Sequence, residues 1–171
     1  VVSLNLFPRL TRGRANAETT AELVRCIAPL FAIVVLLVAL CAEPVTRILY
    51  GEQFARPTAE LFWWLALGAW CIGTQSVLNA HLAARGAPAE LVIFWAVALA
   101  FNVVMNILLL PIAGAFIAPL AASLTYALLL FGHLRLFVKE IGSWSALVPR
   151  PQEVVRFVRT AIRLSPPVTS D

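Results

Sequence analysis

Charged side chains are missing from three long stretches of the chain. No Asp, Glu, Lys or Arg occurs in residues 26–42, 61–84 or 91–134, which are 17, 24 and 44 residues long. Together these runs make up half of the 171 residues, and 61% of all residues are hydrophobic against 13% that are charged. Soluble domains carry about 45–50% apolar and about 25% charged residues. The sequence therefore excludes a soluble domain, a disordered segment and a nucleic-acid-binding domain.

The three runs predict four transmembrane helices. A helix that spans a bilayer needs roughly 17–25 mostly apolar residues, and the first two runs each fit one such helix. The third run is too long for one span and contains Pro111 and Gly114, which predict a helix stop followed by a turn. We therefore expect an all-α, polytopic membrane helical bundle. Its spans are predicted at about residues 26–49, 58–83, 90–110 and 115–138.

Residues 1–25 are expected to hold the end of a preceding helix and a cytoplasmic loop. The first long helix is predicted to end near Pro44, and the short amphipathic stretch after it could be capped by Gly51. Glu43 and Arg47 stand four residues apart, so they would pair if the helix continued past the proline. The chain opens without a methionine and reads like the last turns of an earlier helix, which predicts a fragment of a longer protein.

Lys and Arg residues are distributed unequally around the predicted spans. Eleven of the 13 lie before the first span, in the second connection or after the last span, and only Arg47 and Arg56 lie on the opposite side. Loops rich in Lys and Arg stay in the cytoplasm. Both chain ends are therefore predicted to be cytoplasmic, which agrees with an even number of spans.

Residues 139–171 are expected to form a cytoplasmic tail with a basic amphipathic helix at about residues 152–164. Arg156, Arg159 and Arg163 share one face of this helix, while apolar side chains cover much of the other. Such a helix lies on a membrane surface and attracts anionic lipid headgroups. The tail is thus predicted to contact membrane lipids at the cytoplasmic face.

Amide side chains occur inside the second and third spans. Gln75 and Asn79 share one helix face, and Asn102 and Asn106 share a face of the next span. Amides in hydrocarbon need hydrogen-bond partners. Two interpretations stay open: the amides bond to a neighbouring helix, or they line a polar cavity. All four are candidate substrate-cavity residues.

No pattern of catalytic or metal-binding residues stands out, so we expect no enzyme activity, metal or cofactor. The three cysteines lie in apolar runs without metal-ligand spacing. His81 and His133 are interpreted as interfacial polar residues, because neither has a carboxylate beside it in sequence. Ser123 and Thr125 are expected to hydrogen-bond to carbonyls of their own helix.

Four short motifs occur in an order that resembles one family of membrane transporters. They are Phe7-Pro8-Arg9-Leu10, the segment from Ile48 to Phe54 with Gly51, the turn Leu82-Ala83-Ala84-Arg85-Gly86, and Asn102 and Asn106 followed by Pro111 and Gly114. The chain looks like the C-terminal part of a polysaccharide (O-antigen type) flippase of the multidrug/oligosaccharidyl-lipid/polysaccharide exporter superfamily. One departure is Ile117-Ala118-Pro119, where the family often has a second glycine and paired alanines.

The resemblance implies a core of twelve helices in two six-helix lobes, to which this chain supplies the last four helices of the second lobe. It implies transport of a lipid-linked glycan by alternating access in a bacterial inner membrane, as part of polysaccharide and lipopolysaccharide biosynthesis for the cell envelope. The partners would be the glycan, membrane lipids and the remaining helices of the parent chain. No substrate residue carries over from the family.

Two other functions remain open. A multidrug or small-solute exporter of the same superfamily normally needs carboxylates inside the membrane, and none lies in the charge-free runs. A non-transporting four-helix membrane scaffold would anchor partners through its basic tail.

Overall fold

A computed structural model describes residues 17–150, 152–155 and 157. Within this part of the chain the regular elements are all helical, which confirms the predicted all-α class. The elements are α2 (Ala17–Tyr50), α3 (Glu52–Ala84), α4 (Ala89–Ala113), α5 (Ile117–Ile141) and the short 3-10 helix η1 (Trp144–Leu147).

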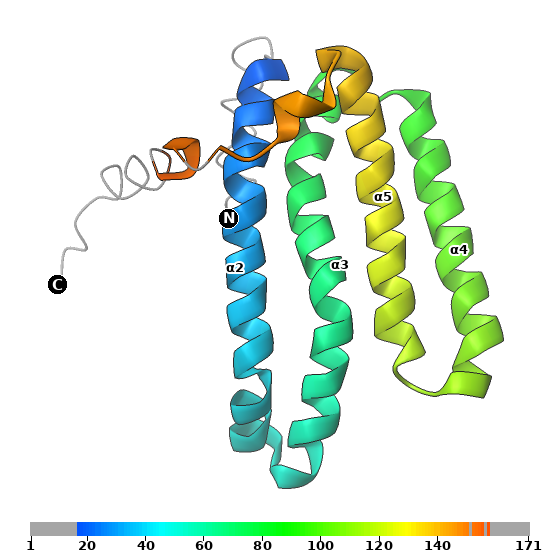
Figure 1. Ribbon diagram of the computed structural model, residues 1–171. Helices are drawn as coiled ribbons and strands as arrows, with labels where there is room; N and C mark the ends of the chain where they lie inside the picture. Colours follow the sequence, from blue (N-terminus) through cyan, green and yellow to red (C-terminus); the bar gives the residue numbers. More distant parts are fainter. Residues whose placement is uncertain (1–16, 151, 156, 158–171) are drawn as a thin grey trace, which may run out of the picture.

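The four long helices lie side by side in one layer, in the spatial order α2, α3, α5, α4 (Figure 1). Helices α2 and α3 form one antiparallel hairpin and α4 and α5 form a second, and α5 packs against α3. The α2–α3 hairpin reaches beyond the α4–α5 pair at the end that carries the α2–α3 junction (Figure 1). The layer therefore has two broad faces, with α2 and α4 at its edges.

All four helices are long and apolar enough to cross a membrane. Even α4 and α5, with 25 residues each, reach about 38 Å at 1.5 Å per residue, against about 30 Å for the hydrocarbon core. In α4 only Leu91 and Ala98 are buried, and most of its other apolar side chains are exposed. Exposed apolar surface of this extent is typical of lipid-facing helices. The protein is a membrane protein with four candidate spans.

Helix α2 does not end near Pro44 as the sequence predicted but continues to Tyr50. A proline inside a helix removes one backbone donor, and α2 continues past this position for six more residues. Arg47 lies 2.9 Å from Glu43 and 2.6 Å from Glu52, which confirms the predicted pairing of Glu43 and Arg47. The chain turns instead at Gly51, whose φ of 92° is in the range that favours glycine.

The predicted helix end at about residue 110 is likewise early, by three residues, since α4 continues to Ala113. The reversal occurs at Gly114, which has a φ of 88° and donates its N–H to the carbonyl of Leu110 at 3.0 Å. The proline therefore lies in the last turn, where only one backbone hydrogen bond is lost.

Helices α3 and α5 are in close contact at Gly68. A Cβ atom at this position would lie 2.8 Å from the Cα atom of Ser123. The Ser123 hydroxyl donates to the carbonyl of Trp64 at 2.6 Å and accepts from the Gly68 N–H at 3.1 Å. The expectation that Ser123 bonds to its own helix is thus wrong, whereas Thr125 does bond to the carbonyl of Ala121 at 2.7 Å.

The main hydrophobic core lies between α2, α3 and α5, in the half of the layer near η1. Its buried members include Val24 from α2, Leu78 from α3 and Phe137 from α5, and Leu147 of η1 packs against them.

Candidate functional site

The two candidate amides on α4 make different bonds: Asn102 joins this helix to α5, and Asn106 bonds within α4. Asn102 donates from Nδ2 to Thr125 Oγ1 at 3.0 Å, and Asn106 donates from Nδ2 to the carbonyl oxygen of Asn102 at 2.9 Å. Both amide side chains are half-buried. Of the two interpretations drawn from the sequence, the bond to Thr125 favours packing against a neighbouring helix for Asn102, whereas Asn106 bonds within α4.

The candidate amides on α3 differ from each other. Gln75 is 3% exposed, and its Oε1 has no hydrogen-bond partner among the described residues. Asn79 is exposed, and its Oδ1 lies 3.4 Å from Nε2 of His133 on α5. Within the described part of the chain, no hydrogen bond joins these two amides to those of α4, so the structure does not unite the four candidates in one cluster.

His133 on α5 lies next to Asn79 and is fully buried. Its Nδ1 donates to the carbonyl of Leu129 at 2.7 Å, and its ring meets the ring of Trp95 edge-on at 6.4 Å. Asn79, His133 and Trp95 come from α3, α5 and α4, so three helices contribute to this part of the layer. Neighbouring side chains of α3 and α4 thus cover His133, which is part of the helix packing.

His81 is also fully buried, and it connects three helices. Thr20 Oγ1 on α2 lies 2.8 Å from His81 Nδ1, and Glu140 Oε2 on α5 lies 3.1 Å from His81 Nε2. Arg85, one turn further along α3, pairs with the second carboxylate oxygen of Glu140 at 2.7 Å. Sequence reasoning missed this cluster because Glu140 is 59 residues away from His81.

A hydroxyl, an imidazole and a carboxylate in line also occur in hydrolases, where they activate the hydroxyl as a nucleophile. Thr20 and His81 are both 0% exposed, so a substrate has no route to the Thr20 hydroxyl in this structure. A carboxylate can only accept, so Nε2 of His81 donates to Glu140, and a second hydrogen bond joins Nδ1 to the Thr20 hydroxyl. This arrangement can hold α2, α3 and α5 in register.

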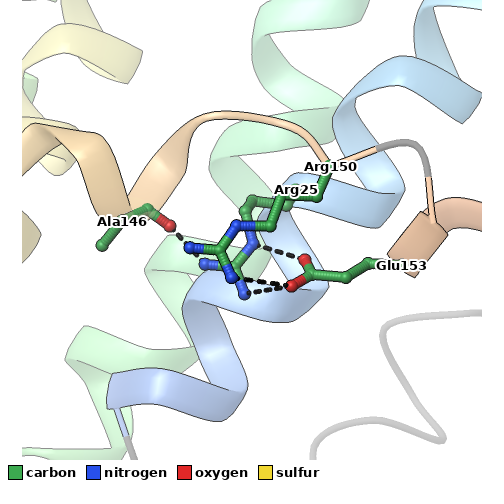
Figure 2. Close-up of polar contacts among 4 residues, drawn as sticks. All are labelled: Arg25, Ala146, Arg150 and Glu153. Atoms are coloured by element: carbon green, nitrogen blue, oxygen red, sulfur yellow. Dashed lines mark hydrogen bonds and ion pairs between the residues drawn. The ribbon is translucent and has the colours of Figure 1, made fainter.

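A second polar cluster ties the segment after η1 to α2. Figure 2 shows the Arg25 guanidinium between Glu153 and the carbonyl of Ala146, with Arg150 alongside. Arg25 Nε lies 2.6 Å from Glu153 Oε2, and Nη2 lies 3.2 Å from Oε1. The Arg25 side chain is only 11% exposed, and Arg150 adds a longer contact of 3.4 Å to Glu153. The fork geometry of Arg25 thus fixes a chain segment 128 residues later in the sequence.

Basic residues of the described chain gather at one end of the layer. By their positions along the helices, Arg25, Arg85, Arg135, Lys139 and Arg150 lie at the end with the α3–α4 turn, whereas Arg47 and Arg56 lie at the opposite end. The helix directions thus separate these residues in space as the sequence predicted.

Some predicted features fall outside the described residues. These are the first motif at Phe7–Leu10 and the membrane-surface residues Arg156, Arg159 and Arg163 of the predicted tail helix. Among the residues that are described, no group of three or more His, Cys, Asp or Glu side chains could hold a metal ion.

Comparison of the chain with protein-family models, with curated proteins and with solved structures found no match.

Proposed function

We propose that the chain contributes four transmembrane helices to a flippase that moves lipid-linked oligosaccharide or polysaccharide precursors across a bacterial inner membrane. The observation that carries the proposal is the open single layer with Asn79 exposed on it. An amide facing hydrocarbon is unfavourable. Further helices of a parent chain would cover this face, and the amide would then line a polar cavity between them.

The positions of the sequence motifs support the same proposal. The Ile48–Phe54 segment forms the junction of α2 and α3, the Leu82–Gly86 segment forms the start of the α3–α4 turn, and Gly114 ends α4. Three of the four motifs thus coincide with the reversals of the chain. In the proposed transporter these four helices belong to the second of two lobes, and both chain ends are cytoplasmic.

The proposed roles of the four amides differ. Asn79, which is exposed, is the candidate for contact with the hydroxyl groups of a glycan, whereas Gln75, one turn earlier in α3, is buried. Asn102 holds α4 against α5 through Thr125, and Asn106 bonds back to Asn102 within α4. Alternating access would move this layer as a unit against the other lobe.

The test is complementation of a strain that lacks the parent gene. The parent gene with Asn79→Leu is expected to restore little surface polysaccharide at a normal protein level in the membrane, whereas Ser76→Ala on the same exposed side of α3 is expected to restore it fully. Full surface polysaccharide after deletion of the parent gene would contradict the proposal. Loss of dye or drug efflux in that strain would favour the small-solute exporter instead.

A further inference from the structure

A groove of about 250 Å³ lies between the first turns of α4 and the last turns of α5. It lies at the end of the layer where most of the described basic residues gather. Its lining combines apolar and charged side chains: Glu90, Ile93, Phe94, Arg135, Leu136 and Lys139.

The apolar wall of the groove is built by close packing of the two helices. Phe94 packs over Gly132, where a Cβ atom would lie 2.8 Å from the aromatic ring. Leu136 and Leu91 are buried together with Leu82, and Phe94 packs against them. The wall is therefore a fixed feature of the α4–α5 interface, and it continues into the exposed apolar surface of α4.

The charges of the groove do not balance. Arg135 and Lys139 stand one turn apart on α5, and Glu90 is the one carboxylate in the lining. Glu90 lies 3.4 Å from Lys139, and both side chains are more than half exposed, so this pair is weak. Arg135 makes no ion pair with any residue in the described ranges. The groove thus presents a surplus of positive charge beside an apolar wall.

We propose that this groove binds the phosphate headgroup of an anionic membrane phospholipid. Arg135 directly follows the charge-free run of the third and fourth helices, so its guanidinium lies where a span leaves the hydrocarbon. Basic pockets between transmembrane helices at this level take anionic headgroups. The phosphate lies between Arg135 and Lys139, and the first acyl carbons run along Phe94 and Ile93. The volume suits a headgroup and the start of its chains, and the site requires no transport activity.

The test is lipid titration of the full chain in detergent, followed by native mass spectrometry. Dioleoyl phosphatidylglycerol is compared with dioleoyl phosphatidylcholine. The unsubstituted chain is expected to retain the anionic lipid preferentially. Arg135→Gln and Lys139→Gln are each expected to weaken this binding about five-fold, as for one basic residue at a charged membrane surface. Glu90→Gln is expected to strengthen it, which gives a gain of binding that misfolding cannot produce.

Arg150→Gln is the matched control, because Arg150 lies at the same end of the layer but outside the groove. It is expected to leave lipid retention unchanged. Equal losses in the control and in the groove variants would overturn the proposal and indicate a general surface charge effect. Equal retention of the two lipids would also overturn it. Displacement of the lipid by inorganic phosphate at the same concentration would show a site for free phosphate rather than for a membrane lipid.

Discussion

His81 on α3 and Glu140 on α5 are joined at the end of the layer by a contact of 3.1 Å between Nε2 and Oε2. The imidazole is fully buried, and its other nitrogen contacts Thr20 of α2. One side chain thereby satisfies polar groups from two neighbouring helices. Because both partners come from other helices, these contacts help to fix how α2 and α5 lie against α3.

Replacing His81 tests this role. His81→Ala leaves the Thr20 hydroxyl buried without its partner and removes one partner of Glu140, and an unsatisfied buried polar group costs about 1–3 kcal/mol. A lower thermal midpoint of unfolding in detergent is expected. Arg56→Gln, at a side chain that is 87% exposed, is expected to leave the midpoint unchanged. Equal thermal midpoints of unfolding for His81→Ala and the unsubstituted chain would contradict a structural role for the Thr20–His81–Glu140 cluster.

The contact of Gly68 with Ser123 predicts a steric effect. Gly68→Leu would push side-chain atoms into the backbone of α5, because a Cβ atom alone already lies 2.8 Å from Ser123 Cα. Overpacking of this kind costs about 1–3 kcal/mol. Pairs of cysteines introduced across α3 and α5 should therefore cross-link with altered yields in Gly68→Leu. Ala83→Leu, on an exposed part of α3, is the control and should leave these yields unchanged. Unchanged cross-linking in Gly68→Leu would mean that the helices do not touch there.

The Arg25–Glu153 pair predicts how firmly the segment after η1 is held. Arg25→Gln removes both contacts to Glu153, and hydrogen bonds to charged groups contribute about 1.5–3 kcal/mol. Limited proteolysis should then cut this variant between Val148 and Glu153 faster than it cuts the unsubstituted chain. Arg150→Gln, which loses only a contact of 3.4 Å to Glu153, should be cut at nearly the rate of the unsubstituted chain.

Orientation can be tested with single cysteines in a variant whose Cys26, Cys41 and Cys71 are replaced by serine or alanine. Because basic residues stay in the cytoplasm, Arg85→Cys is expected to resist a membrane-impermeant thiol reagent added to intact cells. Arg56→Cys, at the opposite end of the layer, is expected to react. The reverse labelling pattern would place the chain ends outside the cell.

The number and class of the helices could be predicted because they depend on local composition. A charge inside the bilayer is so unfavourable that charge-free runs outline the spans directly. The ends were less accurate at Pro44 and Pro111, because a proline in the last turns of a helix removes one hydrogen bond and leaves the helix intact. Gly51 and Gly114, which can adopt a positive φ, mark the reversals better.

The partners of buried polar residues could not be predicted because they depend on which helices become neighbours. Nothing in the sequence indicates that α5, and not α4, lies beside α3, so neither Glu140 beside His81 nor Ser123 beside Gly68 could be found. One signal was present: His81 and Arg85 lie one turn apart near the same end as Glu140. A donor pair and a carboxylate predicted at the same membrane surface favour a contact between their helices.

The spatial order of the layer also bears on how the chain is made. Because α5 lies between α3 and α4, α4 leaves the ribosome before the helix against which it packs. The hairpin of α2 and α3 can assemble as soon as both have entered the bilayer, but α4 must wait in lipid without its neighbour. Assembly of the layer is therefore completed only when the last span is inserted.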